Sequence, residues 1–171
     1  MGIDLVFSYI CVMKTNLNIL VINWQCISNP QGGGAEVHMH EIFKRVAKRG
    51  HKVTILASCF PGCKSEEIID GIRVIRRGSR NLFNFLVPSE YKKLAKAEKF
   101  DIVIDDINKI PFYTPLYVKE PLLAISHHFF GKSIFREAGF VAGNYVYFGE
   151  YLINKVYKRT PFAVVSRSEE H

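Results

Sequence analysis

Pairs of carboxylate and imidazole side chains stand at the ends of apolar runs in this chain. Asp105 and Asp106 come at the end of one run, with Asn108 two residues later, and His127 and His128 follow another. A carboxylate can act as a catalytic base, and a histidine can exchange a proton near neutral pH. Adjacent residues of an extended chain point to opposite sides. We therefore expect one of the two histidines to face a substrate; purely structural roles for these side chains stay open.

A run of three glycines supplies a second candidate for binding chemistry. Gly32, Gly33 and Gly34 follow the first apolar run and precede a helical segment that carries Glu36 near its start. Backbone N–H groups at a helix N-terminus bind phosphate and other anions, and glycine lets a ligand approach the backbone closely. The run therefore predicts an anion-binding loop, with a flexible surface turn as the alternative.

Two well-known nucleotide motifs are incomplete here. The dinucleotide fingerprint requires Gly or Ala where Val37 stands, and no acidic residue ends the next strand to hold a ribose. The segment 131–133 (Gly-Lys-Ser) is similar to the end of a P-loop, but Ser126 stands where that motif requires glycine. The sequence therefore indicates neither a nicotinamide or flavin cofactor nor a P-loop.

Apolar runs alternate with segments of helical periodicity along the chain. The predicted strands cover residues 17–24, 51–58, 71–76, 101–105, 121–126 and 161–166. The predicted helices cover residues 35–49, 88–98 and 134–158. This alternation indicates parallel pairing with right-handed crossovers, and hence an open, mostly parallel α/β sheet with helices on both faces.

Ligands bind beyond the carboxyl ends of the strands in a sheet of this kind. The glycine run, the aspartates, Asn108, the histidines and Ser166 all follow predicted strands, so we expect them to gather along one rim. Residues 17–171 are predicted to form one domain. Residues 1–16 are predicted to be an N-terminal extension that the core does not require.

Composition limits the classes of protein that this chain can belong to. It has 171 residues, of which 48% are hydrophobic and 23% charged, values that exclude a disordered, collagen-like or long coiled-coil chain. No continuous apolar run reaches the roughly 18–20 residues of a membrane span. The formal net charge of +7 indicates an anionic partner, such as phosphate or an acidic membrane surface. Beyond this charge, no motif points to nucleic acid.

Basic and sulfur-containing side chains add two weaker indications. Four lysines of the predicted second helix and its end are expected to form a solvated face: Lys92, Lys93, Lys96 and Lys99. A second basic set stands near aromatic residues and predicts either a membrane-facing patch or core packing: Lys155, Lys158, Arg159, Phe140, Tyr147 and Tyr151. Cys59 and Cys63 have a spacing that zinc sites allow, but no second ligand pair is near in sequence, so free thiols are expected.

Five segments, in order, carry a resemblance to a known family. They are Gly-Gly-Ala-Glu at 33–36, Arg-Gly-His-Lys-Val at 49–53, Asp-Gly-Ile-Arg-Val at 70–74, the run 121–128 and the run 163–168 with its Ser-x-Ser turn. Together they resemble the amino-terminal half of glycosyltransferase family 4 proteins, from about Leu17 to the end of the chain.

The resemblance implies a GT-B architecture, in which two Rossmann-like domains face each other across the active site. It implies transfer of a sugar from a nucleotide-sugar donor to an acceptor, with retention at the anomeric carbon and with no metal or other cofactor. It places the Gly32–Gly34 loop near the donor phosphates and His127 at the transferred sugar or acceptor. His128 stands where the family often has Asp, and Asp105, Asp106, Asn108 and Ser166 are candidate substrate contacts.

The resemblance also implies a second, donor-binding domain, which is expected to be absent from this chain and whose absence would leave the chain with little or no activity. The expected location is the cytoplasm, with a peripheral position at the inner membrane face. Two alternatives stay open. One is a stand-alone α/β module that binds an anion or nucleotide without catalysis. The other is a metal-dependent enzyme that uses His127, His128 and Asp105.

Overall fold

The first apolar run, residues 17–24, forms the middle strand of a seven-stranded sheet in the computed structural model. The structure describes residues 16–108, 110–127, 144, 148 and 151–164. The strands are β1 (Asn18–Asn23), β2 (Lys52–Cys59), β3 (Glu66–Ile69), β4 (Ile72–Ser79), β5 (Ile102–Ile107), β6 (Leu122–Ser126) and β7 (Phe162–Val164), in the order β3-β4-β2-β1-β5-β6-β7. Every pair is parallel except β3 with β4. The predicted open, mostly parallel α/β sheet is therefore confirmed, and it is Rossmann-like.

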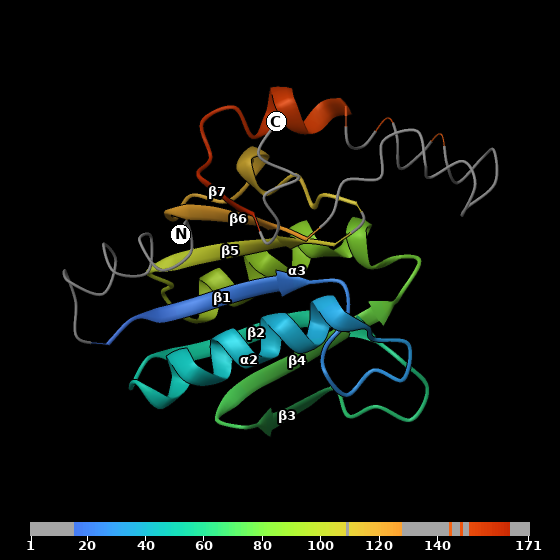
Figure 1. Ribbon diagram of the computed structural model, residues 1–171, viewed down its shortest axis with the longest axis vertical. Helices are drawn as coiled ribbons and strands as arrows, with labels where there is room; N and C mark the ends of the chain where they lie inside the picture. The colour runs from blue at the N-terminus through green and yellow to red at the C-terminus, as the bar shows by residue number, and fades with distance from the viewer. Residues whose placement is uncertain (1–15, 109, 128–143, 145–147, 149–150, 165–171) are drawn as a thin grey trace.

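Two long helices cover the two faces of this sheet (Figure 1). On one face, Met39, Phe43 and Val46 of α2 (Gly34–Lys48) pack against residues such as Val21 of β1. On the other face, α3 (Phe83–Ala97) buries its own apolar stripe against the alternate residues of the same strands. Strand side chains alternate between faces, so the central strands must be apolar on both sides, as the continuous run 17–24 indicates.

Several boundaries differ from the sequence prediction, each for a physical reason. α3 begins at Phe83 and not at Pro88, because Phe83, Val87 and Tyr91 lie one helical turn apart and bury the same face. β5 continues beyond residue 105, the end of the predicted strand, and includes Asp106, because hydrogen-bonding partners allow the carboxylates of Asp105 and Asp106 to be buried inside it.

One strand and one short helix were not predicted. β3 pairs antiparallel with β4 through a tight turn in which Asp70 (φ 51°) and Gly71 (φ 83°) both have positive φ. Its sequence, Glu-Glu-Ile-Ile, lacks the continuous apolar character of a central strand because β3 lies at the edge of the sheet. A single 3-10 turn, η1 (Thr114–Leu116), lies between β5 and β6.

The part of the predicted third helix that the structure describes includes helical residues at 151–156. Within the described residues, no helix combines the length and the apolar character that crossing a bilayer would need. The four lysines at 92, 93, 96 and 99 are exposed, as predicted. Cys26, Cys59 and Cys63 are free thiols, with Cys26 buried. Residues 1–15 of the predicted N-terminal extension lie outside the described residues, as do His128 and Ser166.

Candidate functional site

The loop from β1 to α2 brings the glycine run to the carboxyl end of the central strands. Gly33 is the N-cap of α2, and its N–H donates to Glu36 Oε2 at 2.7 Å. The other oxygen, Glu36 Oε1, accepts a hydrogen bond from Asn108 Nδ2 at 2.8 Å. Glu36 is only 2% exposed, although it is a charged residue. One buried carboxylate therefore fastens the glycine loop to the chain that leaves β5.

The surroundings of the first and third glycines of the loop differ, so glycine stands at these two positions for different reasons. Gly32 lies against Asn29, whose carbonyl oxygen accepts the Gly32 N–H at 2.8 Å and would be 3.0 Å from a Cβ at position 32. A Cβ at Gly34, in contrast, would meet no atom within 4 Å. Packing inside the loop therefore favours glycine at position 32. At position 34 the open space is consistent with close approach of a ligand, which is the role that the sequence predicts.

A pocket of about 220 Å³ opens beside this loop, and we call it the glycine-loop pocket. Its walls combine backbone from the loop with polar and aromatic side chains: Trp24, Gln25, Gln31, Gly33, Gly34, Ala35, Glu36, Arg80 and Asn108. Four predicted site residues thus line one cavity: Gly33, Gly34, Glu36 and Asn108. Trp24, Gln25, Gln31 and Arg80 were not predicted; the available signal was that they follow the carboxyl ends of β1 and β4.

A histidine–aspartate pair lies on the α2 side of the same rim. His127 Nε2 is 2.7 Å from Asp106 Oδ1, and the two side chains are 8% and 0% exposed. Burial raises the pKa of Asp106, and the bond to His127 opposes this shift. The predicted residues Asp106 and His127 are therefore brought together, and the carboxylate fixes the orientation of the imidazole ring.

His38 of α2 extends this pair and was not predicted. Its ring lies edge-on to that of His127, with 5.6 Å between the ring centroids. Burial lowers the pKa of His38, and His127 lowers it further, so the neutral form of His38 is favoured. The sequence could have indicated His38 through its position, because it lies two residues after Glu36, near the start of α2.

Several buried polar atoms around this pair have no protein hydrogen-bond partner among the described residues. They are the side-chain amide of Asn23, Asp106 Oδ2 and His38 Nδ1. Asn23 and Asp106 are register partners on β1 and β5, so their side chains leave the same face of the sheet. Buried polar groups normally have hydrogen-bond partners. A cluster of buried donors and acceptors without protein partners is therefore typical of a site that binds polar ligands.

Asp105 lies apart from this group, because successive residues of a strand face opposite ways. Its Oδ2 accepts hydrogen bonds from the hydroxyls of Thr114 and Tyr157, each at 2.5 Å. Complete burial raises the pKa of Asp105 to about 6 despite these bonds. The structure thus separates Asp105 from Asp106 and His127. Across the described residues, no three His, Cys, Asp or Glu side chains gather where they could hold a metal ion.

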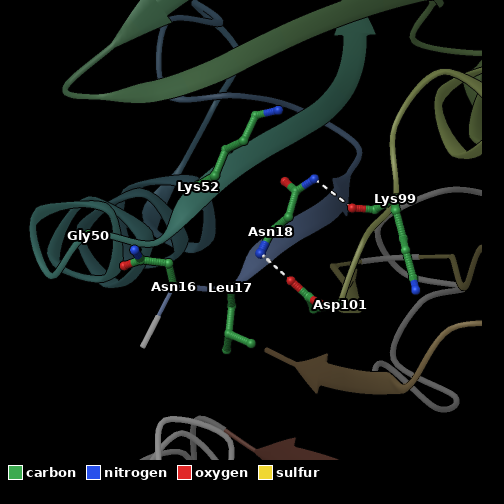
Figure 2. Close-up of a pocket in the computed structure, with 7 residues that line it drawn as sticks. All are labelled: Asn16, Leu17, Asn18, Gly50, Lys52, Lys99 and Asp101. Atoms are coloured by element: carbon green, nitrogen blue, oxygen red, sulfur yellow. Dashed lines mark hydrogen bonds between the residues drawn. The ribbon is translucent and has the colours of Figure 1, made fainter. Parts of the chain in front are cut away.

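A further pocket lies at the opposite, amino-terminal edge of the strands (Figure 2). Its polar groups mostly bond to one another: the Asn18 N–H donates to Asp101 Oδ2 at 2.8 Å, and Asn18 Nδ2 donates to the Lys99 carbonyl at 2.8 Å. Lys52 nearby is paired with Glu98 at 2.5 Å. These bonds join β1 to the start of β5, and they explain the polar character of this edge without a ligand.

A family model described as Glycosyltransferase Family 4 matches residues 32–168, a range that begins at the glycine loop and includes Glu36, His38, Asp106 and His127. No curated protein matches the chain.

Proposed function

The chain belongs to glycosyltransferase family 4, and from that premise we propose that it contributes the acceptor-side domain of a retaining transferase that uses a nucleotide-sugar donor. The observation that carries the proposal is the double hydrogen bond of Glu36, which holds the glycine loop beside Asn108 on the same rim as the Asp106–His127 pair. This arrangement supports the proposal, because transfer from a sugar phosphate requires a phosphate-binding loop and an oriented side chain on the same rim.

Each part of this rim has a chemical role in the proposal. The exposed backbone at Gly34, with the positive end of the α2 dipole, stabilises the diphosphate that leaves the sugar. His127 contacts the transferred sugar or the acceptor hydroxyl, and Asp106 keeps its ring in position. His38 excludes solvent from one edge of that ring. The proposal needs no metal ion, since helix dipole and backbone N–H groups carry the charge stabilisation.

The three glycines of the loop are exposed to solvent, and this bears on activity. Transfer requires that two substrates be aligned and that water be kept from the activated sugar, and an open rim does neither. We therefore propose that a second, donor-binding domain must cover this rim for efficient transfer. The 171-residue chain by itself is expected to bind nucleotide sugar and to turn it over slowly or not at all.

The experiment is calorimetric titration of the chain with UDP-, GDP- and ADP-sugars, alongside the free sugars and inorganic phosphate. We expect at least one nucleotide sugar to bind, and Gly34→Ala to weaken that binding tenfold or more because its methyl group occupies open space beside the loop. Lys96→Ala, on the exposed face of α3, is the control and should bind as the unaltered chain does.

Three results would contradict this proposal in different ways. Inorganic phosphate binding as tightly as every nucleotide sugar would favour a stand-alone anion-binding module. Unchanged affinity in Gly34→Ala would remove the loop from the site. Sustained sugar transfer by the chain alone would show that no covering domain is needed.

We also propose that the protein works in the cytoplasm at an anionic membrane surface, on the inner face. The net charge of +7 supports this, as do the exposed rings of Phe148 (61%) and Tyr151 (57%) with Lys155 Nζ 5.4 Å from the Tyr151 ring centroid. Aromatic rings and basic side chains together favour the interface of an acidic bilayer.

A further inference from the structure

Four arginines lie on β4 and just beyond it, and three of them are neutralised by carboxylates. Arg73 pairs with Glu66 at 2.6 Å and with Glu98 at 2.7 Å. Arg76, whose side chain is fully buried, pairs with Glu67 at 2.6 Å, and Arg77 lies 3.5 Å from Glu90. The fourth, Arg80, has no carboxylate partner among the residues that the structure describes. Its charge is therefore available to an anion from outside the chain.

The position of Arg80 is fixed from two directions. The Trp24 indole N–H donates to the Arg80 carbonyl at 2.9 Å, and the guanidinium carbon lies 5.8 Å from the Trp24 ring centroid. Arg80 Nη1 also donates to the neutral side-chain oxygen of Gln31 at 3.0 Å. A guanidinium has five N–H donors in a planar fork, so most of the donors of Arg80 stay available for a ligand. The contacts with Trp24 and Gln31 hold these donors in a fixed position.

Arg80 and Gln31 form the wall between the glycine-loop pocket and a second, larger pocket. This second cavity, which we call the Arg80 pocket, has a volume of about 460 Å³, within the usual range of small-molecule sites. Pro30, Phe60 and Pro61 give it apolar walls, and Asn29 and Asn81 add amide groups. It lies at the carboxyl ends of β2 and β4, on the same rim as the glycine loop.

We propose that the Arg80 pocket binds an acidic carbohydrate, a sugar that bears a carboxylate or a phosphate group. The apolar wall suits the C–H face of a sugar ring, the amides suit its hydroxyl groups, and the guanidinium fork matches a carboxylate or phosphate in a bidentate manner. The inference rests on the proposed function for one point only, that this sugar is part of the acceptor. The shared wall then places the acceptor next to the donor phosphates.

Binding can be followed through the single tryptophan of the chain, since Trp24 lies under the Arg80 guanidinium. Glucuronate and glucose 1-phosphate are titrated at constant ionic strength, with glucose as the neutral counterpart, and Trp24 fluorescence and calorimetry are recorded. We expect one or both anionic sugars to bind at least tenfold more tightly than glucose. The stronger of the two identifies the group as carboxylate or phosphate.

Variants test whether Arg80 is responsible. Arg80→Gln should weaken anionic-sugar binding at least tenfold, and Arg80→Lys, which keeps the charge without the fork, at least threefold. Arg45→Gln is the matched control, because it removes one positive charge from an exposed site on α2 and should leave affinity within twofold. Calorimetry gives the affinities of the Arg80 variants, and thermal unfolding confirms that they are folded.

The outcomes separate this inference from the proposed function. Equal binding of glucose and both anionic sugars, or unchanged affinity in Arg80→Gln, would overturn the Arg80 pocket even if nucleotide sugars bind at the glycine loop. Loss of anionic-sugar binding in Gly34→Ala but not in Arg80→Gln would assign the anion to the helix N-terminus and would also overturn it. Anionic-sugar binding that depends on Arg80 would support it even if no nucleotide sugar binds.

Discussion

At the scale of single residues, the two adjacent aspartates of β5 have different surroundings. Asp106 faces α2 and holds the ring of His127, whereas Asp105 faces the other way and accepts hydrogen bonds from Thr114 and Tyr157. Both are fully buried, so both have a raised pKa. The Asp105 cluster joins β5 to the 3-10 turn and to the segment that precedes β7, which makes it a structural group near the proposed site.

The raised pKa of Asp105 predicts how stability depends on pH. Its pKa is about 6 in the folded chain, compared with 3.8 for an unperturbed aspartate. Between these values the folded state binds more protons than the unfolded state, so the stability contributed by this group falls as pH rises. The difference, 6 − 3.8, corresponds to about 3 kcal/mol, fully lost above pH 6.

Asp105→Asn should therefore be more stable than the unaltered chain at pH 8, by up to about 3 kcal/mol. The asparagine oxygen can still accept from Thr114 and Tyr157 but cannot ionise. Urea unfolding at pH 4 and pH 8 measures the effect, and at pH 4 the two proteins should agree closely. A variant that is less stable than the unaltered chain at pH 8 would show that Asp105 stabilises the fold as a carboxylate.

At the scale of elements, the loop between β1 and α2 is held by its own contacts and by β4. Arg76 of β4 donates to Ser28 Oγ at 2.6 Å and to Cys26 Sγ at 3.1 Å, and so fastens the start of the loop. Glu36 of α2 fastens its end through the Gly33 N–H. With both ends held, the glycine backbone between them is positioned before any ligand binds, which lowers the entropic cost of binding.

The glycines of this loop should differ when replaced by alanine. Gly32→Ala should lower the free energy of unfolding by about 1–2 kcal/mol, since its Cβ would lie 3.0 Å from the Asn29 carbonyl oxygen. Gly34→Ala should raise it by about 0.4–1 kcal/mol, because position 34 is the first residue of α2 and has space for a methyl group. Urea unfolding of both variants measures these changes. Equal destabilisation by the two would contradict the loop packing described above.

At the scale of the whole molecule, positive charge and aromatic exposure suggest where the protein works. The excess of 23 basic over 16 acidic side chains produces a long-range attraction to acidic surfaces. Exposed lysines include those on the outer face of α3 and those on the segment around Tyr151. Among the described residues, the segment around Tyr151 exposes two aromatic rings, those of Phe148 and Tyr151, whereas α3 exposes the single ring of Phe85. We therefore expect orientation on a membrane to depend more on the Tyr151 segment than on α3.

Vesicle binding tests this expectation. The chain should cosediment with vesicles that contain 30% phosphatidylglycerol, and binding should weaken strongly when salt is raised from about 0.05 to 0.3 M, because added ions screen the attraction. The double variant Lys155→Glu/Lys158→Glu should bind several-fold more weakly. The matched control, Lys92→Glu/Lys96→Glu, changes the net charge equally on α3 and should lose much less. Equal losses would show that net charge alone drives binding.

The sequence by itself determined the sheet and most of the rim. Continuous apolar runs such as residues 17–24 can be satisfied only when both faces are covered, so they specify central parallel strands and the helices between them. Because parallel strands end at one rim, the order of elements alone predicts that the glycine loop and the residues after β5 and β6 lie at the same edge. The joining of Glu36, Asn108, Asp106 and His127 at that edge agrees with this prediction.

Only the tertiary structure decided which side chains at the rim contact one another. Strand alternation assigns Asp105 and Asp106 to opposite faces, but which face meets α2 depends on how the helix packs. The approach of His38 to His127, and of Arg80 to Trp24 and Gln31, joins segments far apart in sequence through contacts for which no local pattern exists. Local propensity and periodicity specify elements, whereas a site at the rim of a sheet is formed by long-range packing, and that is why its full membership is known only from the folded chain.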